Sequence, residues 1–103
     1  MIKVNPDPTF TETIEITAPG RKKPVNVTLT FKYRTADELA TLWKVSDGKK
    51  PSDVFADIVV GWSGFDKDYT DESREEFLKN YPSAFIEISA AYQDLLIGSR
   101  AKN

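Results

Sequence analysis

The feature that most constrains the fold is a change of hydrophobic period at residues 33–35. Before it, apolar residues alternate strictly with polar ones, in the order Val25, Val27, Leu29, Phe31 and Tyr33. Such alternation is the period of a strand with one buried face. After it, Thr35 to Glu38 match a capping box, which starts a helix by capping two backbone amides. We therefore predict a strand from about Val25 to Tyr33 and a helix from Thr35.

A first strand and a long loop precede this second strand. Phe10, Ile14 and Ile16 share one face of the predicted strand, which follows a Pro-rich lead-in at residues 5–8. Turn residues at both ends of segment 18–24 predict a long hairpin loop. An isolated hairpin is marginal in water, so the helices that follow must cover its apolar face. Its edges stay open to partners.

Four short helical segments follow, each marked by apolar residues three and four positions apart. We predict the first over about 35–45. The second has Ser52 as a possible cap and continues through Val59 to Trp62, where the glycines at 61 and 64 loosen it. Thr70 caps the third, and Pro82 lies in the first turn of the fourth.

These elements predict an α+β fold in which an N-terminal β-hairpin packs on a bundle of about four short α-helices. The 103 residues fit a single domain, residues 1–103. Its lead-in and β-hairpin occupy residues 1–34, and its helical part occupies residues 35–103.

The last helix carries a second apolar patch. Ile86, Ala90 and Ile97 cluster on a flank apart from the main stripe, which contains Phe85 and Ile88. One interpretation is that the helix is buried on two sides. The other is that this flank is a subunit or partner interface. Both remain open from the sequence.

Charge is distributed unevenly along the chain, although the net charge is only -2. Residues 1–34 carry six basic and three acidic residues, whereas residues 35–103 carry eight and thirteen. Arg21, Lys22 and Lys23 form a basic hairpin tip, which is either solvated or an interaction surface. The acidic excess lies at Asp66, Asp68, Asp71, Glu72, Glu75 and Glu76. We expect two charged poles, and a net charge this low argues against general nucleic-acid binding.

The composition offers little catalytic chemistry, because the chain has no cysteine and no histidine. Residues 61–65 approach the G-x-S-x-G pattern, but Phe65 replaces its second glycine and no histidine can activate Ser63. We expect a non-catalytic protein with no metal and no cofactor. It has no apolar run of membrane-spanning length and no secretory leader pattern, so we expect a soluble, intracellular protein that binds no membrane.

The order of several short motifs carries a resemblance to a known family. The hairpin ends in Thr-Phe-Lys-Tyr-Arg-Thr at 30–35, and Ile-Val-Val-Gly-Trp at 58–62, Tyr-Thr-Asp-Glu at 69–72 and Asn-Tyr-Pro at 80–82 follow. The chain closes with Gly-Ser-Arg-Ala-Lys-Asn at 98–103. In this order and spacing it resembles the tail assembly chaperones of long-tailed, siphovirus-like bacteriophages and prophages, over nearly its whole length.

This resemblance implies a protein that binds the tape measure protein and keeps it soluble while tail tube subunits polymerise. It implies a homo-oligomer made in the host bacterial cytoplasm and absent from the mature virion. It also implies a frameshifted long form that recruits the tail tube protein. The alternative is a structural subunit of a phage tail or head-tail connector, which would be found in virions.

The ribosomal frameshift can be placed on the sequence. If Ala101, Lys102 and Asn103 are encoded GCA AAA AAC or GCA AAA AAT, the message contains a run on which two tRNAs can slip back one base. Chance use of these residues at a polar end is the other interpretation.

Overall fold

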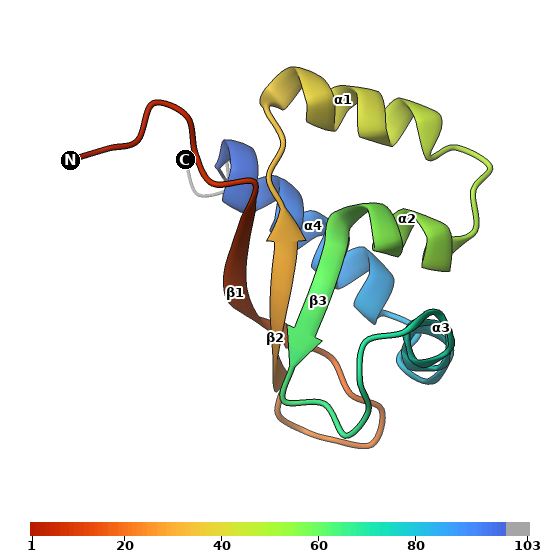
Figure 1. Ribbon diagram of the computed structural model, residues 1–103. Helices are drawn as coiled ribbons and strands as arrows, with labels where there is room; N and C mark the ends of the chain where they lie inside the picture. Colours follow the sequence, from red (N-terminus) through yellow and green to blue (C-terminus); the bar gives the residue numbers. More distant parts are fainter. Residues whose placement is uncertain (99–103) are drawn as a thin grey trace.

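The computed structural model describes residues 1–98, which form one three-stranded antiparallel sheet and four helices (Figure 1). In chain order the elements are β1 (Thr9–Ile16), β2 (Val25–Lys32), α1 (Ala36–Val45), α2 (Pro51–Ile58), β3 (Val59–Ser63), α3 (Asp71–Asn80) and α4 (Ala84–Ile97). The predicted α+β class, with an N-terminal hairpin and four helices, is confirmed. The prediction made for Ala101–Asn103 lies outside the described residues.

β1 and β2 form the predicted hairpin, and β3 pairs with the other edge of β2, so that the sheet order is β1-β2-β3. The register places Phe10 opposite Phe31 and Ile16 opposite Val25. β2 ends one residue before the predicted Tyr33. The Tyr33 amide nevertheless donates to the Pro8 carbonyl oxygen at 2.8 Å, so the lead-in is held beside the end of β2.

The face of the sheet that no helix covers is polar. Hydroxyl pairs join β1 to β2 across this face, Thr11 to Thr30 at 3.2 Å and Thr13 to Thr28 at 3.1 Å. Cross-strand pairs of this kind support a hairpin whose outer face meets water.

Glu12 is the exception on the opposite, apolar face. It lies opposite Leu29 and shares its face of β1 with Phe10 and Ile14, yet it is exposed. A charge on the inner face of an edge strand is one of the devices by which proteins prevent another strand from pairing there.

The prediction that the second helix continues to Trp62 is wrong, because the chain enters a strand at Val59. α2 ends at Ile58, and Val59 has the extended backbone angles φ -108° and ψ 123°. Val59 and Val60 are β-branched, so they lose side-chain freedom in a helix and suit a strand. Phe31 of β2 lies opposite Val59, with a register irregularity beside it. Pairing with the hairpin therefore decides the conformation of this segment.

Two helix starts also differ from the prediction. Lys50 is the N-cap of α2 and Pro51 its first residue, so Ser52 lies inside the helix and does not cap it. A proline is favourable at the first helical position because its missing amide proton has no helical partner there. Pro82 lies two residues before Ala84, where α4 begins, and so precedes the first turn.

The predicted caps of α1 and α3 are confirmed. The Glu38 amide donates to the Thr35 hydroxyl at 3.2 Å, and the Thr35 amide donates to the Glu38 carboxylate at 2.9 Å. Thr70 and Ser73 make the corresponding pair of contacts at the start of α3. Each box satisfies two amides that have no partner within the helix.

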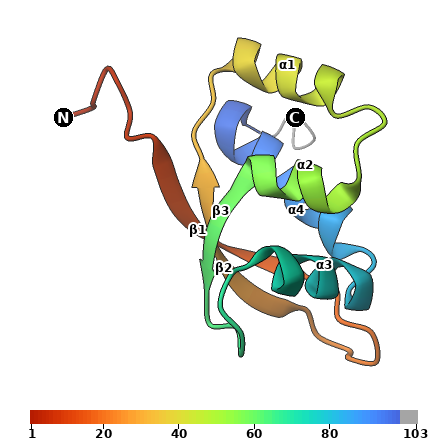
Figure 2. The same cartoon turned by 45° about the vertical axis from the view of Figure 1, so that its right-hand side comes forward.

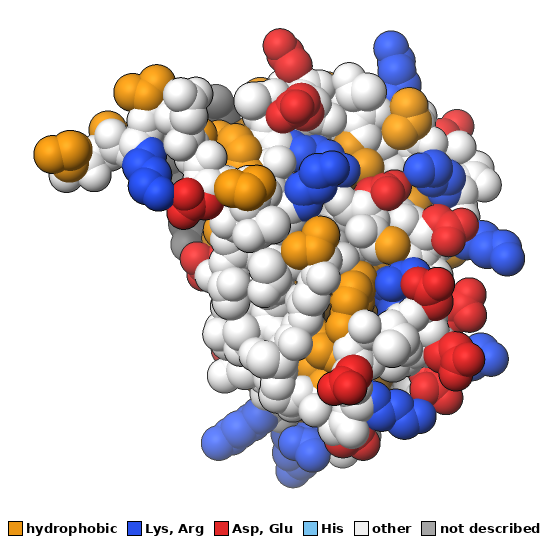
Figure 3. All heavy atoms as spheres, in the orientation of Figure 1, with side chains coloured by type: hydrophobic (Ala, Val, Ile, Leu, Met, Phe, Trp, Pro, Cys, Tyr) orange, Lys and Arg blue, Asp and Glu red, His pale blue; other side chains and the backbone are white. Residues whose placement is uncertain are grey.

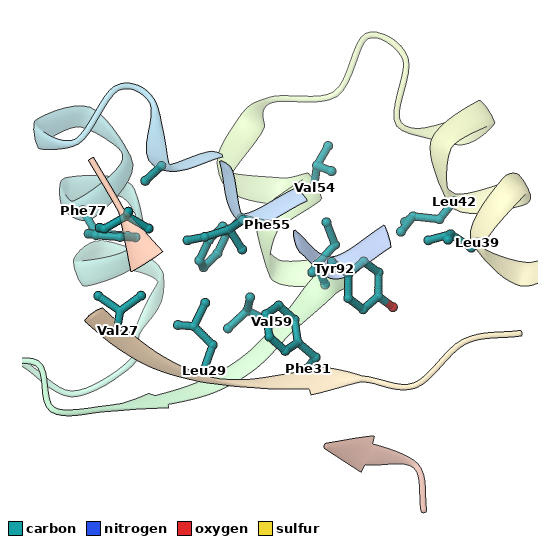
Figure 4. Close-up of a cluster of buried hydrophobic side chains, with 14 residues drawn as sticks. Val27, Leu29, Phe31, Leu39, Leu42, Val54, Phe55, Val59, Phe77 and Tyr92 are labelled. Carbon is teal, nitrogen blue, oxygen red and sulfur yellow. The ribbon is translucent and has the colours of Figure 1, made fainter. Parts of the chain in front are cut away.

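The core lies between the inner face of the sheet and the helices (Figure 4). Its buried apolar residues are Ile16, Val27, Leu29, Phe31, Leu39, Leu42, Val54, Phe55, Ile58, Val59, Phe77, Ala84, Ile88 and Tyr92. The apolar face of the hairpin is therefore covered by helices, as predicted: α2 and α4 lie against the hairpin, and α1 adds Leu39 and Leu42 to the cluster from its side of α4, with Trp43 packed against it.

Tyr92 connects three elements inside this core, where it is 0% exposed. Its ring stacks on Phe31 of β2, with ring centroids 5.5 Å apart. Its hydroxyl donates to the Lys32 carbonyl oxygen at 2.6 Å and accepts from Arg34 at 3.0 Å. Arg34 also donates to the Asp57 carbonyl oxygen near the end of α2 at 2.6 Å. Burial raises the pKa of the Tyr92 hydroxyl, which keeps it neutral and able to donate.

Glu87 fixes the start of α4 to the end of β1. Its carboxylate accepts from the Thr17 amide at 2.9 Å and from the Thr17 hydroxyl at 2.6 Å. These hydrogen bonds from Thr17 lower the pKa of Glu87, because they favour the charged carboxylate.

We expect Leu29→Asp to unfold the protein, because Leu29 is 0% exposed and a carboxylate there would have no partner. Burying an unpaired charge costs several kcal/mol, a large share of a total stability of about 5 to 15 kcal/mol. Leu29→Ala should lower the free energy of unfolding by about 2 to 5 kcal/mol. The matched control is Asn26→Asp, which adds the same charge at an exposed position of β2. A Leu29→Asp variant that melts at the wild-type temperature would contradict this packing.

The Glu87 contact predicts an acid-sensitive contribution to stability. Its pKa is lowered on folding, so the contribution is present above about pH 4.5 and is lost as the pH falls through the folded-state pKa. Glu87→Gln should therefore destabilise the protein at pH 7 and have less effect at pH 3, as measured by urea unfolding at both pH values. An equal loss at both pH values would show that the charge of Glu87 is not what stabilises the contact.

Candidate functional site

A groove of about 770 Å³ runs between α4 and the segment from α1 to α2. Figure 2 shows α4 passing behind α2 and reaching the space below α1. The groove is lined by Trp43, Ser46, Asp47, Lys49, Pro51, Val54, Phe85, Ile86, Ser89, Ala90, Gln93 and Asp94. Its apolar part comes from α1, α2 and α4 together, and its charged residues, Asp47, Lys49 and Asp94, are exposed.

Two of the three residues predicted on the α4 flank line this groove. Ile86 is 69% exposed, and Ala90, one turn further along, is exposed too. Ile97 is 48% exposed but does not line the groove. The flank is thus not buried within the protein, so the interpretation of a helix buried on two sides is wrong for it. A single exposed isoleucine is common on protein surfaces, whereas apolar side chains that gather along a groove are typical of interaction sites.

Trp43 and Gln93 form one wall of the groove. The Trp43 indole N–H donates to the Gln93 side-chain oxygen at 2.8 Å, which ties α1 to α4. The Trp43 ring also meets the Tyr92 ring edge-on, with centroids 6.5 Å apart. Tyr92 is fixed by its hydrogen bonds to Lys32 and Arg34, so its contact with Trp43 also holds this wall of the groove in place. Trp43 therefore packs against the core with one side and faces the groove with the other.

The second predicted surface, the basic hairpin tip, is fully exposed. Arg21, Lys22 and Lys23 lie in the loop between β1 and β2. The loop is turned by Gly20, whose φ of 79° suits glycine, and the Arg21 amide donates to the Ala18 carbonyl oxygen at 3.1 Å. Among the ion pairs of residues 1–98, none involves this tip. The tip does not line the groove, so the structure separates the two predicted surfaces.

A second hollow, of about 500 Å³, lies between the hairpin, the loop after β3 and α3. We call it the acidic recess; its aromatic lining is Trp62, Phe65, Phe77 and Tyr81, and its carboxylates are Asp66 and Glu76. Sequence reasoning missed it, because these residues come from three segments that are brought together only by the strand β3.

The charged regions do not form opposite poles. The hairpin loop and α3 both lie at the end of the molecule away from α1, in both ribbon views (Figures 1 and 2). Val25 and Asn26, directly after the loop, line the same recess as Asp66. Figure 3 shows acidic side chains gathered over α3 and basic side chains at the lower end of the molecule. The predicted separation into distant poles is therefore wrong, and the two regions are neighbours.

Arg74 was also not recognised as a buried residue. It is 8% exposed, and its guanidinium donates to Asp71 at 2.7 Å and lies over the Tyr69 ring at 5.4 Å from the centroid. Its side chain fills the space between α3 and the loop before it. Spacing on α3 does not reveal this, because the partner Tyr69 lies outside the helix.

Within residues 1–98 no group of three or more acidic, cysteine or histidine side chains is gathered to hold a metal ion. None of the helices in this part of the chain is long and apolar enough to cross a membrane.

The model of a family described as phage tail assembly chaperone matches residues 1–103. No curated protein and no solved structure matches.

Proposed function

The chain belongs to the phage tail assembly chaperone family, and from this membership we propose that it binds the tape measure protein and keeps it soluble while tail tube subunits polymerise. The observation that carries this proposal is that the family match spans the whole chain, residues 1–103. The protein acts by binding and has no catalytic role.

The groove beside α4 is the surface that supports tape measure binding best. It is lined by apolar side chains from three helices, and Ile86 projects from it into solvent. An amphipathic helix can lay its apolar face into such a groove, with anchors three and four residues apart. A long helical chain with exposed apolar residues would be protected from aggregation while these residues are covered. Ala90 leaves room for a close approach, and Ile97 extends the contact along the same helix.

The remaining partners follow from the same proposal. The protein self-associates and works in the host bacterial cytoplasm, and it is absent from the mature virion. A minority long form made by ribosomal frameshifting joins this domain to a segment that binds the tail tube protein. Linking two binding parts raises their effective concentration for each other. Detection of the chain in purified virions would instead favour a structural subunit of the tail or connector.

We expect Ile86→Glu to weaken tape measure binding at least about tenfold, because it places a charge in the apolar part of the groove. Ile86 is 69% exposed, so the variant should fold and melt like the wild type. The measurement is co-expression with the tape measure protein, followed by the fraction of that protein in the supernatant and by its co-purification.

The matched control is Val60→Glu, which puts the same charge at another exposed apolar residue, 46% exposed on β3 and outside the groove. It should bind normally. Equal solubilisation by wild type and Ile86→Glu would exclude the groove as the docking surface. A wild-type chain that fails to keep the tape measure protein soluble would exclude the function itself.

The frameshift prediction is tested on the gene. We expect the codons of Ala101, Lys102 and Asn103 to contain A AAA AAC or A AAA AAT. An extended product should then appear on expression, and it should disappear when Lys102 is recoded from AAA to AAG. An Ala101 codon ending in G, C or T would contradict a slippery site at this position, and tape measure binding would stay unaffected.

A further inference from the structure

We propose that the acidic recess receives the basic hairpin loop of a second copy of this chain, and that the second copy receives the loop of the first. Two copies then close around a two-fold axis. This interface rests on the self-association stated above and is independent of the groove beside α4.

The lining of the recess is suited to a cationic side chain. Trp62 and Phe65 stack face to face, with ring centroids 3.9 Å apart and planes at 9°. Phe77 meets both rings edge-on, with centroids 5.7 Å from Trp62 and 5.3 Å from Phe65. The Trp62 indole N–H is already used, because it donates to the Lys67 carbonyl oxygen at 2.9 Å. Trp62 and Phe65 are both partly exposed, and aromatic rings attract arginine and lysine through their negative faces.

The charge of the recess points to the same occupant. Lys67 pairs with Glu76 at 2.9 Å, and this hydrogen bond raises the pKa of Lys67. Asp66 takes part in none of the ion pairs of residues 1–98. The charged residues that line the recess are Asp66, Glu76 and Lys67, so one net negative charge remains there after Lys67 has paired with Glu76.

The loop is suited to the complementary role. It carries three consecutive cations, Arg21, Lys22 and Lys23, and all three are exposed. Pro19 and Pro24 flank them and restrict the backbone, so less conformational freedom is lost when the loop is bound. The loop lies beside its own recess, yet its cations make no ion pair there. A second copy can therefore supply the carboxylates.

The position of the two surfaces decides the symmetry. If they lay at opposite ends, the contact would be head-to-tail and would build a chain or a ring. Val25 and Asn26 connect the loop directly to the lining of the recess, so the two surfaces form one continuous region. Because one region carries both the basic loop and the acidic recess, the same region of two copies can pair in an isologous contact. Such a contact uses both surfaces of each copy and forms a dimer.

Two charge-reversal variants test this interface. The loop variant changes Arg21, Lys22 and Lys23 to Glu, and the recess variant changes Asp66 and Glu76 to Lys. All five residues are exposed, so the loop variant should keep the wild-type melting temperature, and the recess variant should lose only the small contribution of the exposed Lys67–Glu76 pair. By analytical ultracentrifugation, each variant alone should self-associate at least about tenfold more weakly than the wild type. Mixed in equal amounts, the two variants should form a one-to-one pair, because each reversed surface then meets its complement.

The control reverses three lysines elsewhere, Lys32, Lys44 and Lys50 to Glu, and should associate like the wild type. Raising the salt from roughly 0.05 M to 1 M should weaken the wild-type pair, because the Debye length shortens severalfold. Variants that still associate singly, mixtures that do not pair, or a monomeric wild type would overturn the proposal. Mixtures that form species larger than two would overturn the two-fold arrangement. Tape measure solubilisation is measured on the same variants, so that a failed interface and a failed chaperone function give different results.

Discussion

The structure depends on the burial of the apolar face of the β1-β2 hairpin under the helices, because an isolated hairpin is only marginally stable in water. Leu29 and Phe31 lie at the centre of that face and are both 0% exposed. Tyr92 stacks on Phe31 and donates to the backbone at the end of β2, while Arg34 joins the same hydroxyl to the end of α2. One buried polar network thus sets where α2 and α4 lie on the sheet. The Trp43 ring, which lines the groove, contacts the Tyr92 ring, so the shape of the groove follows from core packing.

Much of the fold could be predicted because its signals are local. The alternation through β2 and the capping box at Thr35 each lie within a few residues, and both are found as predicted. The strand β3 could not be predicted in this way. Val59 continues the apolar stripe of α2, and only the available edge of β2 makes it extended. Its β-branched neighbour Val60 was a signal for a strand, but the helical spacing before it outweighed that signal.

The candidate surfaces were predictable to a different extent. Helical spacing alone identified Ile86 and Ala90 as a separate flank, and both line the groove. The opposite wall could not be predicted, because Trp43 and Val54 belong to other helices. How close these helices lie to α4 depends on tertiary packing, which local spacing does not reveal. Charge counting identified the basic loop and the acidic segment, but it could not show how far apart they lie. Because β3 pairs with β2, both lie at one end of the molecule. Adjacent complementary surfaces favour a two-fold contact, whereas surfaces at opposite ends would favour a head-to-tail contact.

Glu12 has a consequence for the open edge of the sheet. β1 is an outer strand, and an extended segment of another chain could pair with its backbone and extend the sheet. A charge among Phe10 and Ile14, on the side where an added strand would have to be apolar, makes such growth unfavourable. Glu12 therefore opposes sheet growth from β1, whether the added strand comes from another protein or from a further copy of this chain.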